Sequence, residues 1–450
     1  MRFCFVIDNL KGVFRILGII TLLLAIFVQI GYTIFCIYKN EAQPMIKNTL
    51  RVCSFGLLSL LLLLGVYQWG FRWIPLLLLL ALFAIIGIVY FVKKPVSKKP
   101  FRPYKSICSC IVSILLLALC ISPSIIFPQN KPPKLTGEYS IATTAYTYTD
   151  KNRLETYTNS GENRKVTVNL WFPQNAEGKY PLVVFSHGLY GLAQSNTSTF
   201  MELASNGYVV CSISHTYQSM YTLDADGNRI IVSSDFMKEA PYFNDDNIDE
   251  ETKVEFFNKW LKLRTDDMNF VLDTILENAV TKGNDEVYQL IDKDKIGLFG
   301  HSMGGSTAAA TGKDRSDISA IVNIDAPLSV DFFSFEGSKT MTAKDIYPKP
   351  LLNIYSDTLW GHMDEDPKYY ANFRLLYNTG GEVYNIHFKG SKHLSFSDLP
   401  LLSPILANMM QGGKAEIDKY YCIESMNGLI LEFFNCYVKN EDSFNPLETY

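Results

Sequence analysis

The chain contains 450 residues, of which 48% are hydrophobic and 19% are charged, and its mean hydropathy is +0.07. This composition excludes a disordered or collagen-like protein. Residues 1–127 hold 13 Lys and Arg side chains against only Asp8 and Glu41, whereas residues 128–450 hold 28 basic and 43 acidic side chains. Because nucleic-acid binding needs a basic face, the acidic C-terminal part argues against it.

Four apolar runs in the N-terminal part predict transmembrane helices. They occupy residues 16–38, 52–71, 73–92 and 106–127, and none of them contains Asp, Glu, Lys or Arg. About 20 such residues cross a hydrocarbon core of about 30 Å. Aromatic residues typical of membrane interfaces stand at the ends of the runs, at Tyr38, Trp69, Trp73 and Tyr90. We expect residues 1–127 to be an integral, multi-pass domain of the cell membrane.

Charge bias between the runs predicts the orientation of this domain. The loops 39–51 and 93–105 together hold nine Lys and Arg side chains, and positive loops stay in the cytoplasm. With four spans, both the N-terminus and everything after residue 127 would then lie outside the cytoplasm. The basic residues Arg2, Lys11 and Arg15 of the N-terminal tail disagree with this arrangement. The Pro- and Lys-rich segment 128–136 predicts a stiff linker out of the membrane.

The rest of the chain alternates β-rich and helical segments. The pattern predicts strands over residues 165–172, 181–185, 208–212, 295–299, 320–324, 350–355 and 382–388. It predicts helices at about 197–206, 251–281, 303–312, 368–378 and 416–438. Continuous apolar strands separated by amphipathic helices indicate a buried, mostly parallel sheet covered on both faces. We therefore expect one α/β domain over residues 137–450.

A long insertion, residues 213–250, separates one predicted strand from the next helix. A loop of about 35 residues in a compact domain is typically a lid or binding loop, and this one is rich in Tyr, Phe and Met. The alternative is a loop that only packs on the sheet. Within it, Asp226-Gly227 predicts a hairpin turn, and a calcium loop is disfavoured because no glutamate closes the motif.

A candidate nucleophile follows the predicted strand 295–299. Residues Gly300-His301-Ser302-Met303-Gly304-Gly305 form a Gly-x-Ser-x-Gly pattern that opens a helix rich in Ala and Thr. This strand-to-helix context is typical of a nucleophile elbow, in which small flanking residues allow the backbones to approach closely. The pattern predicts Ser302 as the nucleophile of an acyl-transfer reaction.

A serine hydroxyl needs a base, and six histidines are available. His301 lies inside the elbow, His187 follows an early strand where an oxyanion loop is expected, and the others are His215, His362, His387 and His393. The order Ser, Asp, His of an α/β-hydrolase favours His393, which follows the last predicted strand. Asp325 and Asp357 each end a strand between Ser302 and His393, and position alone leaves both open as the acid.

Several segments together resemble the secreted, type II platelet-activating factor acetylhydrolases. They are 180–189 with the pattern Tyr-Pro-Leu-Val-Val-Phe-Ser-His-Gly-Leu, the Arg264-x-x-Asp267 pattern, the elbow 300–305, Ile324-Asp-Ala326 and Gly390-Ser-Lys-His393. The resemblance covers roughly residues 137–440 and not the apolar runs, which the secreted members lack. It implies a calcium-independent esterase of the α/β-hydrolase fold, with Ser302 as nucleophile, His393 as base and Asp325 favoured over Asp357. It also implies the backbone N–H groups of Leu189 and Met303 as oxyanion donors.

We therefore expect a membrane-anchored serine hydrolase that resembles 1-alkyl-2-acetylglycerophosphocholine esterase and cleaves short-chain carboxylic or phospholipid esters. The alternatives are a broader carboxylesterase or polyester hydrolase, and an inactive hydrolase-fold membrane sensor. The sequence shows no metal-ligand cluster or phosphate-binding glycine loop, so we expect no metal and no organic cofactor. Pairing of Cys422 with Cys436 would require a break in the last predicted helix, because 14 residues of helix span about 21 Å.

Overall fold

The computed structural model describes residues 2–93, 100–245, 247–282, 285–328, 347–365, 369–377 and 382–450. The chain divides into two compact units, one of residues 1–131 with 401–406 and one of residues 132–400 with 407–450. Three of the basic residues used to predict the membrane orientation lie outside the described residues, namely Lys94, Lys98 and Lys99. So do positions 368 and 378, the two ends of one predicted helix.

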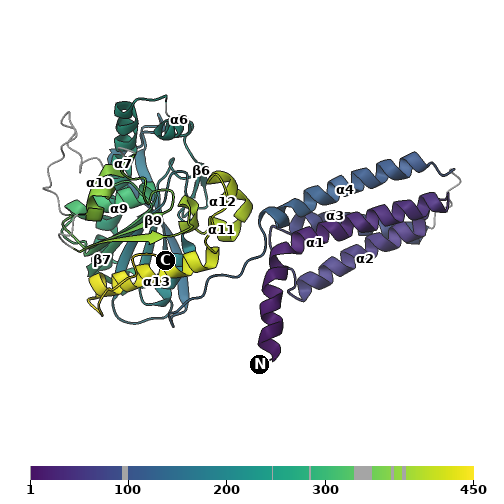
Figure 1. The fold of residues 1–450 in the computed structure, drawn as a ribbon, viewed down its shortest axis with the longest axis horizontal. Coiled ribbons are helices and arrows are strands. Elements are labelled where there is room, and N and C mark those ends of the chain that lie inside the picture. The colour runs from purple at the N-terminus through teal and green to yellow at the C-terminus, as the bar shows by residue number, and fades with distance from the viewer. Residues whose placement is uncertain are drawn as a thin grey trace. The chain divides into compact units, whose positions relative to one another are not determined.

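The first unit contains four long helices: α1 (Arg2–Tyr38), α2 (Pro44–Leu63), α3 (Ile74–Lys93) and α4 (Pro103–Ile126). Four segments are long and apolar enough to cross a membrane, namely Ile16–Tyr38 of α1 and the whole of α2, α3 and α4. α1 packs along α4, α2 packs along α3, and α3 contacts α4 (Figure 1). At one end of the bundle the ring of Tyr67 stacks on Trp73, with ring centroids 4.2 Å apart.

The second helix begins earlier than expected. The run 52–71 predicted its position, but α2 spans Pro44–Leu63, and the chain leaves the helix before Gly65, whose φ is +71°. The prediction was wrong because it excluded charged residues, whereas Lys47 and Arg51 lie in the first two turns of α2. Long cationic side chains near the end of a span can keep their charge at the membrane surface. Lys47 and Arg51 are therefore ionisable side chains inside a segment that is long and apolar enough to cross a membrane.

The second unit is built on an eight-stranded sheet in the order β1-β2-β4-β3-β7-β8-β9-β10. β2 runs antiparallel to its neighbours β1 and β4, and the remaining neighbours are parallel, so the predicted mostly parallel sheet is confirmed. All seven predicted strands are present, and β1 was not foreseen. The strands are β1 (Ile141–Leu154), β2 (Asn163–Pro173), β3 (Tyr180–Ser186), β4 (Val209–Ser214), β7 (Ile291–His301), β8 (Ala320–Ile324), β9 (Leu351–Ser356) and β10 (Val383–Phe388).

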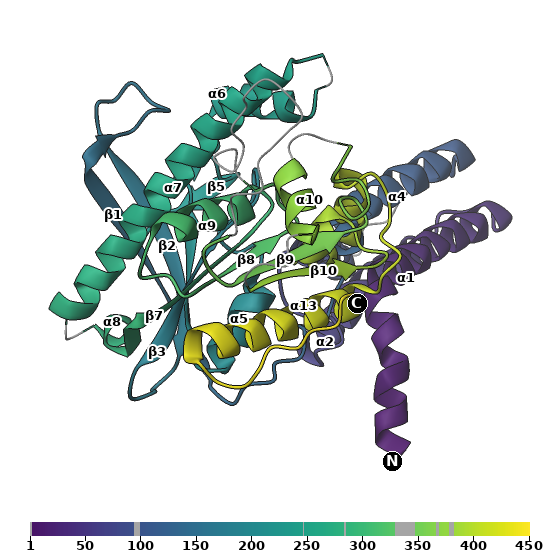
Figure 2. The same ribbon diagram turned by 60° about the vertical axis from the view of Figure 1, so that its left-hand side comes forward.

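Helices cover both faces of this sheet, as expected for the α/β class. α7 and α9 lie on one face, and α5 and α13 lie together on the other (Figure 2). The main α-helices after the linker are α5 (Thr197–Ser205), α6 (Ser234–Glu239), α7 (Glu250–Thr281), α8 (Glu286–Leu290), α9 (Met303–Asp314), α10 (Tyr370–Tyr377), α11 (Leu399–Leu402), α12 (Pro404–Met410) and α13 (Lys419–Phe434).

The core has a different composition on each face. Under α7 and α9 it is mainly aliphatic and includes Val184, Leu272 and Leu298. Under α5 and α13 it is aromatic, and the ring of Phe299 lies 4.8 Å from that of Phe185 and 6.0 Å from that of Phe434. These two layers hold the central strands β3 and β7 rigidly, and the residues that follow both strands form the candidate site.

The last helix is continuous through the position at which a disulfide would require a break. α13 passes from Lys419 to Phe434 and continues as a π-helical turn, Asn435–Lys439. Cys422 and Cys436 are both free thiols in this structure. The disulfide between Cys422 and Cys436 that the sequence left open is therefore absent from this structure.

Candidate active site

Ser302 lies at a sharp turn between strand β7 and helix α9. Its backbone has φ +55° and ψ −134°, a conformation that is uncommon for a residue with a side chain. Its N–H donates to the carbonyl oxygen of Ile324 at 2.8 Å, which fixes the turn to the end of the neighbouring strand β8. The side chain of Ser302 is partly exposed, although the residues on both sides of it are buried. The structure thus has the sharp strand-to-helix turn, here called the elbow, that the sequence pattern predicted.

The turn is possible because glycine occupies two positions of close backbone approach. A Cβ atom on Gly300 would lie 2.1 Å from the carbonyl carbon of Gly304. A Cβ atom on Gly304 would lie 1.9 Å from the carbonyl oxygen of Ser186, at the end of strand β3. No side chain fits at such distances, so the strand and the helix can meet only where both residues are glycine.

His393 is paired with Asp325. The Nδ1 atom of His393 lies 2.7 Å from Oδ2 of Asp325, whose side chain is completely buried, whereas the side chain of His393 is 36% exposed. Asp325 also accepts hydrogen bonds from the N–H of Ser356 at 2.7 Å and from its hydroxyl at 2.9 Å. The carboxylate is therefore held by strand β9 while it orients the imidazole, so the Nε2 atom of His393 is left for chemistry.

The alternative acid, Asp357, is engaged by another histidine. Its Oδ1 atom lies 2.7 Å from Nε2 of His387, and its Oδ2 accepts from the N–H of Gly390 at 2.9 Å. The His387 ring stacks on Trp360 with ring centroids 4.9 Å apart. Asp357 is 47% exposed, so water screens its charge more than that of the buried Asp325. Of the two candidates, the structure brings only Asp325 to His393.

The turn after strand β3 lies directly against the elbow. A Cβ atom on Gly188 would lie 3.0 Å from Cβ of Ser302, so this turn, which continues into Leu189, is in close contact with Ser302. Met303 is the first residue of α9, where an N–H has no acceptor inside the helix. The turn that contains Leu189 and the first residue of α9, Met303, therefore both adjoin Ser302.

A buried arginine supports this turn from helix α7. Arg264 donates through Nη1 to the carbonyl of His187, through Nη2 to that of Gly188 at 3.3 Å, and through Nε to Oε1 of Gln218 at 2.6 Å. The sequence contained the Arg264 pattern but gave no reason to assign it this role. Because the partners come from distant segments, only the fold shows that the arginine holds the turn after β3.

One turn further along α7, Asp267 forms the centre of a buried ion cluster. Its carboxylate accepts from Arg164 at 2.7 and 2.6 Å and lies 3.0 Å from Nδ1 of His215. His215 in turn lies 2.8 Å, through Nε2, from the hydroxyl of Ser186 at the end of β3. Burial would raise the pKa of Asp267, but the Arg164 guanidinium holds it below its ordinary value. This cluster ties helix α7 to the end of strand β3, directly before the turn that Arg264 supports.

Three other histidines are structural in this arrangement. Burial lowers the pKa of His215 to about 4 and that of His301 to about 3, and it lowers the pKa of His187 well below its ordinary value. These imidazoles are therefore uncharged at neutral pH. His362 is exposed and pairs with Glu365. His393 differs from these four because it pairs with Asp325, which directly follows Ile324, the residue whose carbonyl accepts from the N–H of Ser302.

The insertion 213–250 packs over the elbow. Its side chains Val232, Phe236 and Ala240 form one cluster with Trp260 of α7 and Met303, and Leu189 packs against this cluster. The predicted turn at Asp226-Gly227 is confirmed by a hairpin of β5 (Tyr221–Leu223) and β6 (Arg229–Ile231). Residue 246 of the insertion lies outside the described residues. An apolar layer therefore covers Leu189 and Met303.

Among the residues that the structure describes, no group of three or more His, Cys, Asp and Glu side chains has an arrangement that could hold a metal ion.

Comparison with known proteins identifies a family that the chain matches. Residues 137–449 match the family described as platelet-activating factor acetylhydrolase, isoform II. Similar proteins include the platelet-activating factor acetylhydrolases of Cavia porcellus, 27% identical over 296 residues, and of Canis lupus familiaris, 26% identical over 293 residues. The first alignment covers 61% of this chain and 62% of its relative, and the second covers 62% and 61%. The chain thus spans about three fifths of the length of these relatives.

A solved structure shows the same fold. The ferulic acid esterase from Streptomyces cinnamoneus is similar to this chain with a TM-score of 0.54 and 19% sequence identity, over 71% of this chain and 96% of that protein. Together with the sheet order and the elbow, this likeness confirms the expected α/β-hydrolase fold.

Replacement of Asp325 should lower kcat far more than replacement of Asp357. Asp325→Asn removes the carboxylate that orients His393, so kcat for p-nitrophenyl acetate should fall by about 10³–10⁴-fold. Asp357→Asn is the matched control, because it changes the same chemical group on an aspartate bonded to a different histidine, and kcat should change less than about tenfold. Steady-state kinetics of both variants, with thermal melts to check folding, make the comparison. The reverse ranking would reject Asp325 as the acid.

Proposed function

Because the chain belongs to the platelet-activating factor acetylhydrolase, isoform II, family, we propose that it is a membrane-anchored serine hydrolase of carboxylic esters. The observation that carries this proposal is the pairing of His393 with the buried Asp325 beside the elbow serine, Ser302. The alignments span about three fifths of the named relatives, so their activity supports the proposal without deciding the substrate.

The proposed reaction is acyl transfer to water through an acyl-serine. Nε2 of His393 takes the proton of the Ser302 hydroxyl as its oxygen attacks the ester carbonyl carbon, and Asp325 stabilises the resulting imidazolium. The imidazolium then gives its proton to the leaving alcohol oxygen as the carbon–oxygen bond breaks. Water repeats the sequence on the acyl-serine, which releases the carboxylic acid and restores the serine.

The oxyanion that develops on the carbonyl oxygen would be bound by the N–H groups of Leu189 and Met303. Removal of one such donor typically costs about 2.7–4 kcal/mol of transition-state stabilisation. The donors must be held before the substrate arrives, which is the role we assign to Arg264 through its bonds to the carbonyls of His187 and Gly188.

We propose short-chain esters of membrane lipids as the substrate class. The relatives are named for acetyl hydrolysis, and the apolar layer of Val232, Phe236 and Ala240 over the elbow supports a preference for small acyl groups. Four helices that are long and apolar enough to cross a membrane support an enzyme kept at a lipid surface. A broader carboxylesterase is the alternative.

We also propose that the hydrolase unit lies outside the cytoplasm. The ends of α1 and α3 and the beginnings of α2 and α4 carry Lys39, Lys47, Arg51, Lys93, Arg102 and Lys105. The positive-inside rule supports a cytoplasmic position for this end of the bundle, and α4 then leads outward to the hydrolase unit.

Replacement of the nucleophile tests the chemistry. Ser302→Ala removes the attacking oxygen, so hydrolysis of p-nitrophenyl acetate should fall by several orders of magnitude, to the rate without enzyme or close to it. Ser160→Ala, the same change at an exposed loop residue, should leave the rate unchanged. Retention of activity within about tenfold of the wild type by Ser302→Ala would reject Ser302 as the nucleophile.

The layer over the elbow should set the acyl-chain preference. Phe236 is fully buried and contacts Trp260 and Tyr190 edge-on, so Phe236→Ala opens space above Met303. The ratio of p-nitrophenyl octanoate to p-nitrophenyl acetate hydrolysis should rise by about tenfold or more. Met237→Ala, at a neighbouring residue that is 52% exposed, is the control. An unchanged ratio in a folded Phe236→Ala protein would show that this layer does not select the acyl chain.

Protease accessibility tests the orientation. In intact cells or protoplasts that express the chain with a C-terminal tag, externally added protease should remove the tag and digest residues 128–450. A cytoplasmic marker protein in the same cells should stay intact until lysis. Protection of the tag and the fragment until the membrane is lysed would place the hydrolase unit in the cytoplasm.

A further inference from the structure

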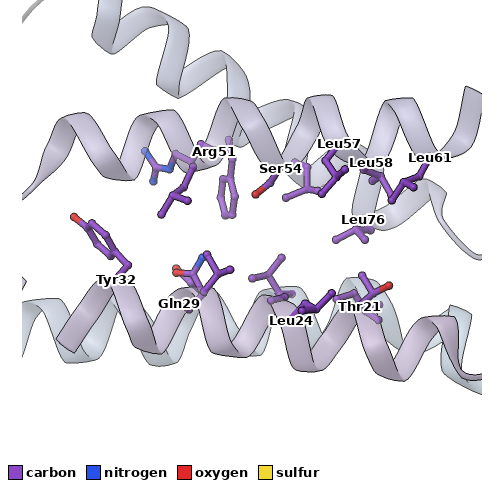
Figure 3. Close-up of a pocket in the computed structure, with 18 of the residues that line it drawn as sticks. Thr21, Leu24, Gln29, Tyr32, Arg51, Ser54, Leu57, Leu58, Leu61 and Leu76 are labelled. Carbon is purple, nitrogen blue, oxygen red and sulfur yellow. The ribbon is translucent and has the colours of Figure 1, made fainter. Parts of the chain in front are cut away.

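A pocket inside the four-helix unit contains none of the candidate catalytic residues. It has a volume of about 220 Å³ and lies between α1 and α2 (Figure 3), and residues of α3 and α4 also line it. Its lining comes from all four helices, as Leu24 of α1, Leu58 of α2, Leu80 of α3 and Leu117 of α4 show. For scale, a dry protein cavity of about 150 Å³ can bind benzene. The space is therefore sufficient for part of a lipid acyl chain.

The pocket opens toward the surroundings of the bundle. Leu24 and Leu57 stand on its two sides, on α1 and α2, and are 60% and 58% exposed. In a membrane these rim side chains would face acyl chains rather than water. An occupant could thus enter sideways and leave part of itself in the bilayer.

One end of the pocket is polar and cationic. Gln29 and Tyr32 of α1 face Arg51 of α2 at this end, whereas leucines such as Leu61 line the other (Figure 3). Lys47 lies one turn before Arg51 on α2 and also lines the pocket. Residues four apart on a helix are neighbours on one face, so the two cations can contact the same ligand.

Both cations have neutral partners. The Nζ atom of Lys47 donates to the hydroxyl of Ser109 at 3.1 Å, and Nη1 of Arg51 donates to Oδ1 of Asn48 at 3.0 Å. The Arg51 guanidinium also lies 5.3 Å from the centre of the Phe83 ring. In the part of the four-helix unit that the structure describes, no ion pair joins either cation to a carboxylate. Two positive charges at the end of an apolar pocket, compensated only by neutral groups, favour an anionic ligand.

The depth of the pocket matches one leaflet of a bilayer. Lys47 and Arg51 lie in the first two turns of α2, at the bundle end that also carries Lys39 and Lys105. From Arg51 to Leu61 the helix rises by about 15 Å, which is half of a hydrocarbon core of about 30 Å. The cations would therefore lie at the level of the lipid head groups, and the leucines would lie at the level of the acyl chains.

We propose that this pocket binds one anionic phospholipid, with its phosphate on Lys47 and Arg51 and one acyl chain between α1 and α2. A phosphate has enough oxygen atoms to accept from both cations, whereas a carboxylate can be satisfied by the arginine alone. The open side between Leu24 and Leu57 leaves the second acyl chain in the bilayer. This inference rests on the proposed insertion of the four helices into a membrane.

Lipid binding to the purified full-length chain in a non-ionic detergent tests the proposal. Native mass spectrometry with increasing phosphatidylglycerol should show one saturable bound molecule, with at least tenfold weaker binding of phosphatidylcholine that has the same acyl chains. Palmitic acid, as the carboxylate of a single chain, should also bind at least tenfold more weakly. Equal binding of phosphatidylcholine or of palmitic acid would overturn the proposal.

Variants locate the binding. Lys47→Gln with Arg51→Gln should weaken phosphatidylglycerol binding at least tenfold, whereas Lys39→Gln with Lys105→Gln removes the same charge at the same bundle end and should not. Ala25→Trp fills the pocket without changing its charge and should also remove the bound lipid. Unchanged binding to both pocket variants would overturn the proposal.

Two further measurements separate the failure of this inference from that of the proposed function. Extraction of expressing membranes with alkaline carbonate should leave the chain in the pellet. Its release would remove the membrane premise and with it the lipid site. Hydrolysis of p-nitrophenyl acetate in detergent should be unchanged in the Lys47→Gln, Arg51→Gln protein. Loss of hydrolysis in that folded variant would show that the pocket belongs to the catalytic machinery and contradict a separate site.

Discussion

The close backbone contact between the elbow and strand β3 is the constraint on which the candidate site depends. Gly304 lies so near the carbonyl of Ser186 that no side chain fits between them, and Gly300 lies equally near Gly304. The register of β3 beside β7 pairs Ser186 with Gly300, so the turn after β3 is placed beside Ser302. One steric requirement thus positions the proposed nucleophile and both proposed oxyanion donors, and the aromatic and aliphatic layers on either face keep these strands in place.

Buried charged groups that do not contact Ser302 stabilise the turn after β3, which lies against the elbow. Asp267 of α7 and Arg164 of β2 form a buried ion pair. Arg264, also on α7, donates hydrogen bonds to the carbonyls of His187 and Gly188 in the turn after β3. Burial lowers the pKa of Arg264 to about 9, so its guanidinium is still protonated at neutral pH. Since a buried charge is costly unless its hydrogen-bonding groups are satisfied, these residues restrict the turn to one arrangement. The stiffness suits a site whose donors must be in place before reaction.

Much of the fold could be predicted from local pattern, and the errors have physical causes. Apolar strands and amphipathic helices are visible over short windows, and Ser302 is found because its turn requires glycine on both sides. The start of α2 was missed because the prediction accepted only runs without charged residues, whereas Lys47 and Arg51 lie inside this helix. The choice between Asp325 and Asp357 depends on hydrogen bonds between residues 31 and 30 positions apart, from Ser356 to Asp325 and from His387 to Asp357. The role proposed for Arg264 likewise depends on contacts that only the folded chain makes.

The central claim is that Ser302 becomes a nucleophile through His393 and Asp325. The most direct measurement is covalent labelling of the full-length chain with a fluorophosphonate, followed by proteolysis and mass spectrometry of the adduct. The account predicts one phosphonylated residue, Ser302, and little labelling when the protein is first unfolded, because a serine without its positioned base is a poor nucleophile. An adduct on another residue of the folded chain, or no adduct at all, would contradict it.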